Sequence, residues 1–157
     1  MIISVSGTPG TGKSAAACIA AERLGWELVE LNKFAEIKNL YAGYDEERKC
    51  KIVDIERMKK EISKISSKNM ILESHYAHDM PCDIAVILRT SPGELRRRLL
   101  KRGWPKRKID ENAEAEIMEI CKSEAIEQGK RVVEIDTTNK TPQKVAEEIV
   151  NYARHES

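Results

Sequence analysis

The sequence predicts an α/β fold of three layers, in which a five-stranded parallel sheet carries helices on both faces. Short apolar runs alternate with helical patterns along the chain, an order typical of parallel strands joined by crossover helices. Each run is short and nearly continuously apolar, as expected of strands covered on both faces. The predicted strands are Ile2–Ser6, Glu27–Leu31, Met70–Glu73, Ile84–Leu88 and Val132–Ile135.

Helix signals are clearest in the second half of the chain. Ser91-Pro92-Gly93-Glu94 combines an N-cap residue, a proline in the first turn and a capping-box glutamate, which predicts a helix from Pro92 to about Arg102. A second helix is predicted over Glu111–Gln128, ended by Gly129. The expected core residues are Ile117, Ile120, Cys121 and Ala125 in that helix, and Val145, Ile149 and Tyr152 in a last helix from Thr141-Pro142.

The segment between Asn32 and Ile65 is more polar, and its second half carries Ile55, Met58 and Ile62 at spacings of three and four. We interpret it as a helical insertion and not as a pair of strands. The sequence contains no internal repeat and no low-complexity linker. Residues 1–157 are therefore predicted to form a single domain, since domains typically contain roughly 100–150 residues.

Composition excludes several classes of function. The chain has 27 Lys and Arg against 26 Asp and Glu, so no overall field attracts nucleic acid. Its four cysteines are widely separated, without CxxC pairs, and are expected to be reduced thiols. No stretch approaches the roughly 18 apolar residues of a membrane span. A cytoplasmic location is expected.

Gly7-Thr8-Pro9-Gly10-Thr11-Gly12-Lys13-Ser14 matches the phosphate-binding pattern G-x-x-x-x-G-K-[ST], directly after an apolar strand and before an Ala-rich helix. Glycine is needed where backbone N–H groups turn inward around phosphate oxygens. Lys13 is expected to reach the β- and γ-phosphates, and Ser14 to offer its hydroxyl to Mg²⁺. The motif predicts a P-loop that binds a nucleoside triphosphate.

Glu73 ends the apolar strand Met70–Glu73, where nucleotide-binding sheets place acids that hold Mg²⁺ or orient a nucleophile. His75 follows two positions later, so in an extended chain both side chains face the same side. A capping or surface acid and a solvated histidine are the plainer alternatives.

Arg98 and Arg102 lie four residues apart on one face of the helix from Pro92, where they could clamp the phosphates of ATP. A row of charges on a helix is more often merely solvated. The following segment, Gly103–Lys108, is interpreted as a basic loop that closes over the triphosphate and excludes water. An exposed basic turn is the alternative.

Taken together, these residues resemble the adenylate kinase family, and in particular its short-lid branch, the adenylate kinase isoenzyme 6 family of nucleoside monophosphate (NMP) kinases. The resemblance covers nearly the whole chain. It is carried by the loop Gly7–Ser14, Leu40-Tyr41-Ala42-Gly43-Tyr44-Asp45-Glu46-Glu47, Glu73-Ser74-His75 and Arg98-Leu99-Leu100-Lys101-Arg102-Gly103.

The resemblance implies an NMP-binding segment near Glu30–Val53, a short lid near Gly103–Ala113, and an adenine site near Asp136–Lys140. It also implies ATPase activity and a role in maturation of the small ribosomal subunit and its 16S rRNA, through ribosomal protein uS11 and pre-ribosomal RNA. The implied ATP-binding residues are Gly10, Gly12, Lys13, Ser14, Ala15 and Arg102.

The chain departs from the family pattern at two positions. Glu36 stands where many relatives carry an arginine directed at the acceptor phosphate, and Lys33 or Arg48 could take its place. Glu73 replaces the aspartate that commonly precedes x-His, which lengthens the reach of the carboxylate by one methylene. Both changes concern acceptor binding and metal geometry more than ATP binding.

The main prediction is an adenylate-kinase-type enzyme that transfers the γ-phosphoryl of ATP to AMP or another NMP, with Lys13, Glu73, His75 and Arg102 as its catalytic residues. The alternative is an ATP-driven ribosome assembly factor whose kinase turnover is incidental. A small-metabolite kinase, such as one acting on shikimate, is disfavoured by the Leu40–Glu47 run. A GTPase is disfavoured because Pro142 stands where N-K-x-D requires aspartate.

Overall fold

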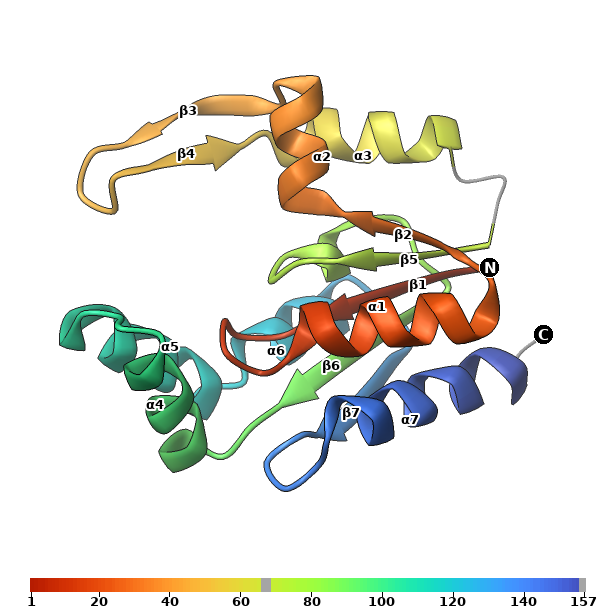
Figure 1. Cartoon of the computed structure of the whole chain (residues 1–157). Coiled ribbons are helices and arrows are strands. Elements are labelled where there is room, and N and C mark those ends of the chain that lie inside the picture. The colour runs from red at the N-terminus through yellow and green to blue at the C-terminus, as the bar shows by residue number, and fades with distance from the viewer. Residues whose placement is uncertain (66–68, 156–157) are drawn as a thin grey trace.

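The computed structural model describes residues 1–65 and 69–155, which surround a five-stranded sheet (Figure 1). All neighbouring strands are parallel, and their spatial order is β2-β5-β1-β6-β7. The predicted fold class is confirmed, and every strand boundary lies within one residue of its prediction. The strands are β1 (Ile2–Ser6), β2 (Glu27–Glu30), β5 (Met70–Glu73), β6 (Ile84–Arg89) and β7 (Val132–Asp136).

Alternate side chains of the strands pack on opposite faces of the sheet. Ile3 and Val5 of β1 pack with α1 (Lys13–Leu24) and α7 (Pro142–His155) on one face. The other face is covered by α2 (Leu31–Lys38), α3 (Ile55–Ile65), the 3₁₀ helix η1 (Ala77–Asp79) and α6 (Ile120–Glu127). Because both faces of the central strands β1, β5 and β6 are covered, these strands are nearly continuous apolar runs, whereas the edge strands β2 and β7 are partly exposed.

Helices α4 (Pro92–Lys101) and α5 (Lys106–Ile117) lie beyond the carboxyl ends of the central strands (Figure 1). They pack on each other through Leu95, Leu99 and Ile109. None of the helices in the described ranges combines the length and apolarity that a membrane span requires.

The insertion between β2 and β5 contains an antiparallel strand pair, β3 (Tyr41–Asp45) and β4 (Cys50–Val53). The prediction that this segment contains no strand pair is wrong. Most residues of the two strands are exposed, so the sequence lacks the alternation that marks half-buried strands. The turn is also inconspicuous, because Lys49 adopts the left-handed conformation (φ 51°) in place of a glycine. The hairpin projects away from the main sheet (Figure 1).

The single helix predicted over Glu111–Gln128 is also wrong, because the chain forms two helices there. Glu119 adopts a left-handed conformation (φ 54°) and separates α5 from α6. As a result Ile117 and Ile120 are exposed instead of lying in the core, whereas Ala125 is buried as predicted. The expected basic loop over Gly103–Lys108 is shorter than predicted, because α5 already begins at Lys106.

Two details of the remaining helices differ from prediction. No capping box forms at α4: the Ser91 N–H donates to Thr138 Oγ1 at 2.9 Å, while the Glu94 carboxylate pairs with Arg97 and Arg98. Tyr152 of α7 is exposed. The other expected core residues of α3 and α7 are buried, namely Met58, Ile62, Val145 and Ile149, with Ile55 partly buried.

Gly7→Ala tests the packing that fixes the start of the loop after β1. A Cβ at Gly7 would lie 2.7 Å from the main-chain oxygen of Leu88 in β6, which cannot move aside without disturbing the sheet. We expect the free energy of unfolding in urea to fall by about 1–3 kcal/mol. Gly93→Ala is the control: its Cβ would meet no atom within 4 Å, and the variant should keep or slightly raise the free energy of unfolding, because alanine favours the helix. Equal stability of the two variants would contradict the packing.

Candidate nucleotide-binding site

The P-loop Gly7–Ser14 joins β1 to α1 at the carboxyl edge of the sheet. Gly10 and Gly12 have φ values of 95° and 90°, which side chains rarely tolerate. A Cβ at Gly10 would lie 2.8 Å from Leu95 Cδ1, so the loop packs directly on α4. Because α1 begins at Lys13, the positive end of its dipole lies at the loop and favours a bound anion.

The Lys13 ammonium is buried within the loop, where Nζ donates to the Thr8 carbonyl oxygen at 3.3 Å. Burial lowers the pKa of Lys13, and the charge of Glu73 opposes that shift. Such an ammonium lacks the water that would normally solvate it. A phosphate group beside it would supply the missing anionic partner.

Glu73 ends β5 beside Val5 of β1, and its side chain is only 8% exposed. Burial raises the pKa of Glu73, while the Lys13 charge and a hydrogen bond from the Ser14 side chain oppose the rise. One carboxylate and one hydroxyl, completed by phosphate oxygens and water, is the ligand set that Mg²⁺ commonly takes in phosphoryl-transfer sites. Ser14 and Glu73 therefore fit a magnesium ion.

His75 lies in a turn and not in an extended strand, since the Ala77 N–H bonds back to the Ser74 carbonyl oxygen at 3.3 Å. The strand geometry expected to align it with Glu73 is therefore absent. Its ring is open to a pocket, and Tyr76 packs edge-on at 5.0 Å between centroids. Partial loss of water, and then the Lys13 charge, lower the pKa of His75 to about 4. The ring is thus neutral at pH 7.

Two pockets contact different parts of the P-loop. One, of about 820 Å³, adjoins Gly10, Thr11 and Gly12 and extends between α4 and the loop after β7. It brings together Arg98, Arg102 and part of the segment Asp136–Lys140. Its other lining residues are Glu94, Arg97, Lys101, Thr137, Thr138, Lys140, Pro142 and Val145.

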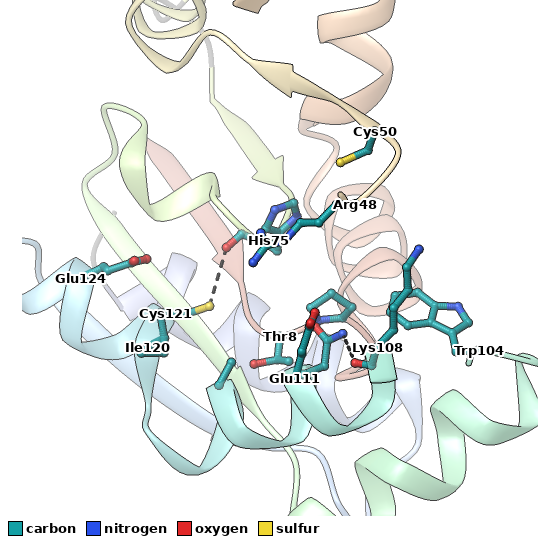
Figure 2. A pocket seen from close by; sticks show the side chains of 13 residues that line it. Thr8, Arg48, Cys50, His75, Trp104, Lys108, Glu111, Ile120, Cys121 and Glu124 are labelled. Carbon is teal, nitrogen blue, oxygen red and sulfur yellow. Dashed lines mark hydrogen bonds between the residues drawn. The ribbon is translucent and has the colours of Figure 1, made fainter. Parts of the chain in front are cut away.

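The second pocket, of about 660 Å³, adjoins Thr8 and Pro9 on the loop. Figure 2 shows Arg48 directed from the β3–β4 hairpin toward His75, with Trp104 and Lys108 on the side of α4 and α5. The rest of its wall comes from α5, α6 and β4, through Cys50, Glu111, Asn112, Ala115, Ile120, Cys121 and Glu124.

Five of the predicted residues line neither pocket: Lys13, Ser14 and Glu73, described above, and Lys33 and Ala15. Lys33 is exposed on α2, and its ammonium pairs with Glu30. Ala15 is exposed in the first turn of α1, next to Ser14. Arg98 is already engaged by protein groups, because its guanidinium donates to the Gly10 carbonyl oxygen at 3.3 Å and to Thr137 O at 2.9 Å. It holds the loop while lining the larger pocket.

The sequence did not reveal two residues outside the P-loop, Thr137 and Glu116, whose side chains form hydrogen bonds with it. Thr137 Oγ1 donates to the Thr11 carbonyl oxygen at 3.0 Å, and Thr8 Oγ1 donates to Glu116 Oε2 at 2.7 Å. These partners are 126 and 108 positions apart in the chain. A threonine after a strand and a glutamate in a charged helix carry no local signal of such contacts.

The sheet order, the P-loop and the two adjoining pockets define a P-loop kinase. Solved structures support this fold: a shikimate kinase from Acinetobacter baumannii has a TM-score of 0.69 at 15% identity, covering 99% of this chain and 94% of that one. A deoxyadenosine kinase from M. mycoides has a TM-score of 0.64 at 16% identity, covering 99% and 100%. A family model described as an AAA domain matches residues 3–119.

Sequence comparison identifies the family more closely. Proteins described as "Putative adenylate kinase" are 41% identical in Pyrococcus abyssi and 39% in Thermococcus onnurineus, each match covering 96% of this chain and 82% of the relative. One from Methanosarcina mazei is 37% identical over 97% and 88%. The chain belongs to this adenylate kinase family, as the sequence resemblance predicted.

The lowered pKa of His75 predicts a pH dependence of stability. An unfolded histidine has a pKa of about 6.5, so the unfolded state takes up the proton first. The contribution of the neutral His75 ring to stability is fully present above about pH 6.5 and is lost as the pH falls toward 4. The unfolding temperature of wild type should therefore fall more steeply between pH 7 and 4 than that of His75→Gln. Trp104→Phe, in the same pocket, should keep the wild-type slope; identical slopes for all three proteins would contradict the assignment.

Proposed function

We propose that this chain is a nucleoside monophosphate kinase that reversibly transfers the γ-phosphoryl of ATP to AMP or another NMP. The observation that carries the proposal is the pair of pockets of about 820 and 660 Å³ that adjoin one P-loop. Hydrolysis needs one nucleotide pocket, whereas transfer between nucleotides needs two that meet at the phosphates. The archaeal relatives described as adenylate kinases add support.

The larger pocket is the proposed donor site. ATP would place its phosphates on Gly10 and Gly12 and extend them toward Lys13, the next residue of the P-loop, with Arg102 beside them and the adenine near Asp136–Lys140. Ser14 and Glu73 would hold Mg²⁺, which supplies charge neutralisation of the phosphates when bound. Lys13 and Arg102 would stabilise the charge that develops as the phosphoryl group leaves.

The smaller pocket is the proposed acceptor site. Arg48 would bind the acceptor phosphate, and the neutral His75 would orient it by hydrogen bonding. Arg107 of α5 pairs with Glu47 at the tip of the hairpin, so the proposed lid and the insertion meet near this pocket. Direct in-line attack by the acceptor oxygen then requires no covalent intermediate.

ATP hydrolysis is a proposed side activity, because water could enter the acceptor pocket in place of the monophosphate. A role in small-subunit maturation, with uS11 as partner, is a second proposal supported by the sequence resemblance. The exposed apolar side chains of Ile117, Met118 and Ile126 are suited to a protein partner. Specific retention of the chain by purified uS11 would support it, and no retention would reject it.

A coupled assay that supplies ATP with each monophosphate, run beside ATP hydrolysis alone, tests the kinase. Wild type is expected to transfer phosphoryl to at least one NMP faster than it hydrolyses ATP. Lys13→Met should lower both rates at least about 100-fold, because the ammonium acts on charge in the transition state. Lys64→Met, on the exposed face of α3, is the control and should match wild type. Transfer no faster than hydrolysis would reject the proposal.

The two candidates for the acceptor phosphate are separated by kinetics. Arg48→Ala should raise KM for the monophosphate about tenfold, because a charge-assisted hydrogen bond of about 1.5–3 kcal/mol is lost. KM for ATP should stay within about twofold. Lys33→Ala should change neither value much, since its ammonium pairs with Glu30 away from the pocket. The reverse pattern would assign the acceptor phosphate to Lys33.

A further inference from the structure

A buried carboxylate connects the lid helix to the P-loop. Glu116 lies on α5 and is 3% exposed. Its Oε2 accepts a hydrogen bond from Thr8 Oγ1 at 2.7 Å, and its Oε1 accepts from Arg89 Nε at 2.6 Å and from the Thr90 N–H at 3.1 Å. One carboxylate therefore joins the P-loop, the end of β6 and α5.

Thr8 transmits this contact into the phosphate-binding loop. Its carbonyl oxygen accepts hydrogen bonds from Lys13 Nζ at 3.3 Å, from the Thr11 N–H at 3.2 Å and from Thr11 Oγ1 at 2.8 Å. Thr8 is buried and also forms part of the wall of the smaller pocket (Figure 2). Displacement of Thr8 would therefore displace the Lys13 ammonium.

Arg89 fixes the carboxylate from the opposite side. It also donates to the Glu116 main-chain oxygen at 2.9 Å, to Glu119 at 2.8 Å and to Glu134 at 3.0 Å. With these partners its guanidinium is held between β6, β7 and the break after α5. The position of Glu116 is thus set by the sheet and not by α5 alone.

We propose that Glu116 is a positioning residue, which holds Thr8 and through it the Lys13 ammonium in the geometry that binds the ATP phosphates. Glu116 belongs to α5, of which residues 106–113 lie in the proposed lid, so a shift of this helix would reach the P-loop through the Glu116 side chain. The effect of Glu116 on phosphoryl transfer rests on the proposed kinase function. Its effect on the conformation of the P-loop does not.

The test alters each side of the Thr8–Glu116 contact. Thr8→Val preserves shape but lacks the donor. Glu116→Gln removes the charge and leaves a single acceptor oxygen for the three donors that the carboxylate serves, whereas Thr8→Ser keeps the hydroxyl. By calorimetry, Kd for MgATP should rise about tenfold in the first two variants and stay within about twofold in the third. The double variant Thr8→Val/Glu116→Gln should bind MgATP no more weakly than the single variant with the higher Kd, because both substitutions act through one contact.

Hydrogen exchange of the Thr11 amide gives a readout that needs no nucleotide, because this N–H donates to Thr8 O. Exchange should be faster in Thr8→Val and Glu116→Gln at temperatures well below unfolding. Glu119→Gln is the matched control: it removes another Arg89 partner without touching Thr8, and should keep wild-type exchange and Kd.

The outcomes separate the two proposals. Wild-type exchange of Thr11 in both folded variants, or additive losses in the double variant, would overturn the role of Glu116. A lowered unfolding temperature with unchanged Thr11 exchange and MgATP affinity would mean that Glu116 serves only stability, which also overturns it. Faster Thr11 exchange in a protein whose wild type transfers no phosphoryl group would support the hold on the loop and reject the kinase.

Discussion

The buried ammonium of Lys13 is the interaction on which the site depends. Removing a lysine from water is costly unless anionic or dipolar groups surround it. The protein supplies the Thr8 carbonyl oxygen, which accepts a hydrogen bond from the ammonium, and the nearby charge of the Glu73 carboxylate. In the proposed function the ATP phosphates supply the further anionic partner. The tight loop around Gly10 and Gly12 and its packing on α4 serve to hold this one charge at the edge of the sheet.

The topology explains why two pockets adjoin the P-loop. Strand β1 lies between β5 and β6, so the chain leaves it toward one side of the sheet and later returns to the other. Ligands of open α/β sheets bind at such a reversal, beyond the carboxyl ends of the strands. The hairpin insertion lies on the β5 side and lines the smaller pocket with Arg48 and Cys50, whereas α4 and α5 follow β6 and lie on the other side (Figure 1).

The sequence predicts those features of the structure that depend on buried apolar runs or on short local motifs. The central strands β1, β5 and β6 are buried on both faces and the edge strands β2 and β7 are short apolar runs, so all five are located within one residue. The P-loop is recognisable because its glycines and Lys13 lie close together in the chain. The exposed β3–β4 hairpin lacks a hydrophobic pattern, and the break at Glu119 depends on one unusual φ. Contacts such as Thr8–Glu116 exist only after folding, because their residues lie 108 positions apart.

The central claim is that one P-loop lies between a donor and an acceptor nucleotide. Calorimetry with two adenosines joined 5′ to 5′ by five phosphates tests it most directly, because such a molecule can occupy both pockets at once. With Mg²⁺, one molecule per chain should bind at least about 100-fold more tightly than ATP and exclude both ATP and AMP. Binding no tighter than that of ATP, or continued binding of AMP to the saturated protein, would contradict the claim.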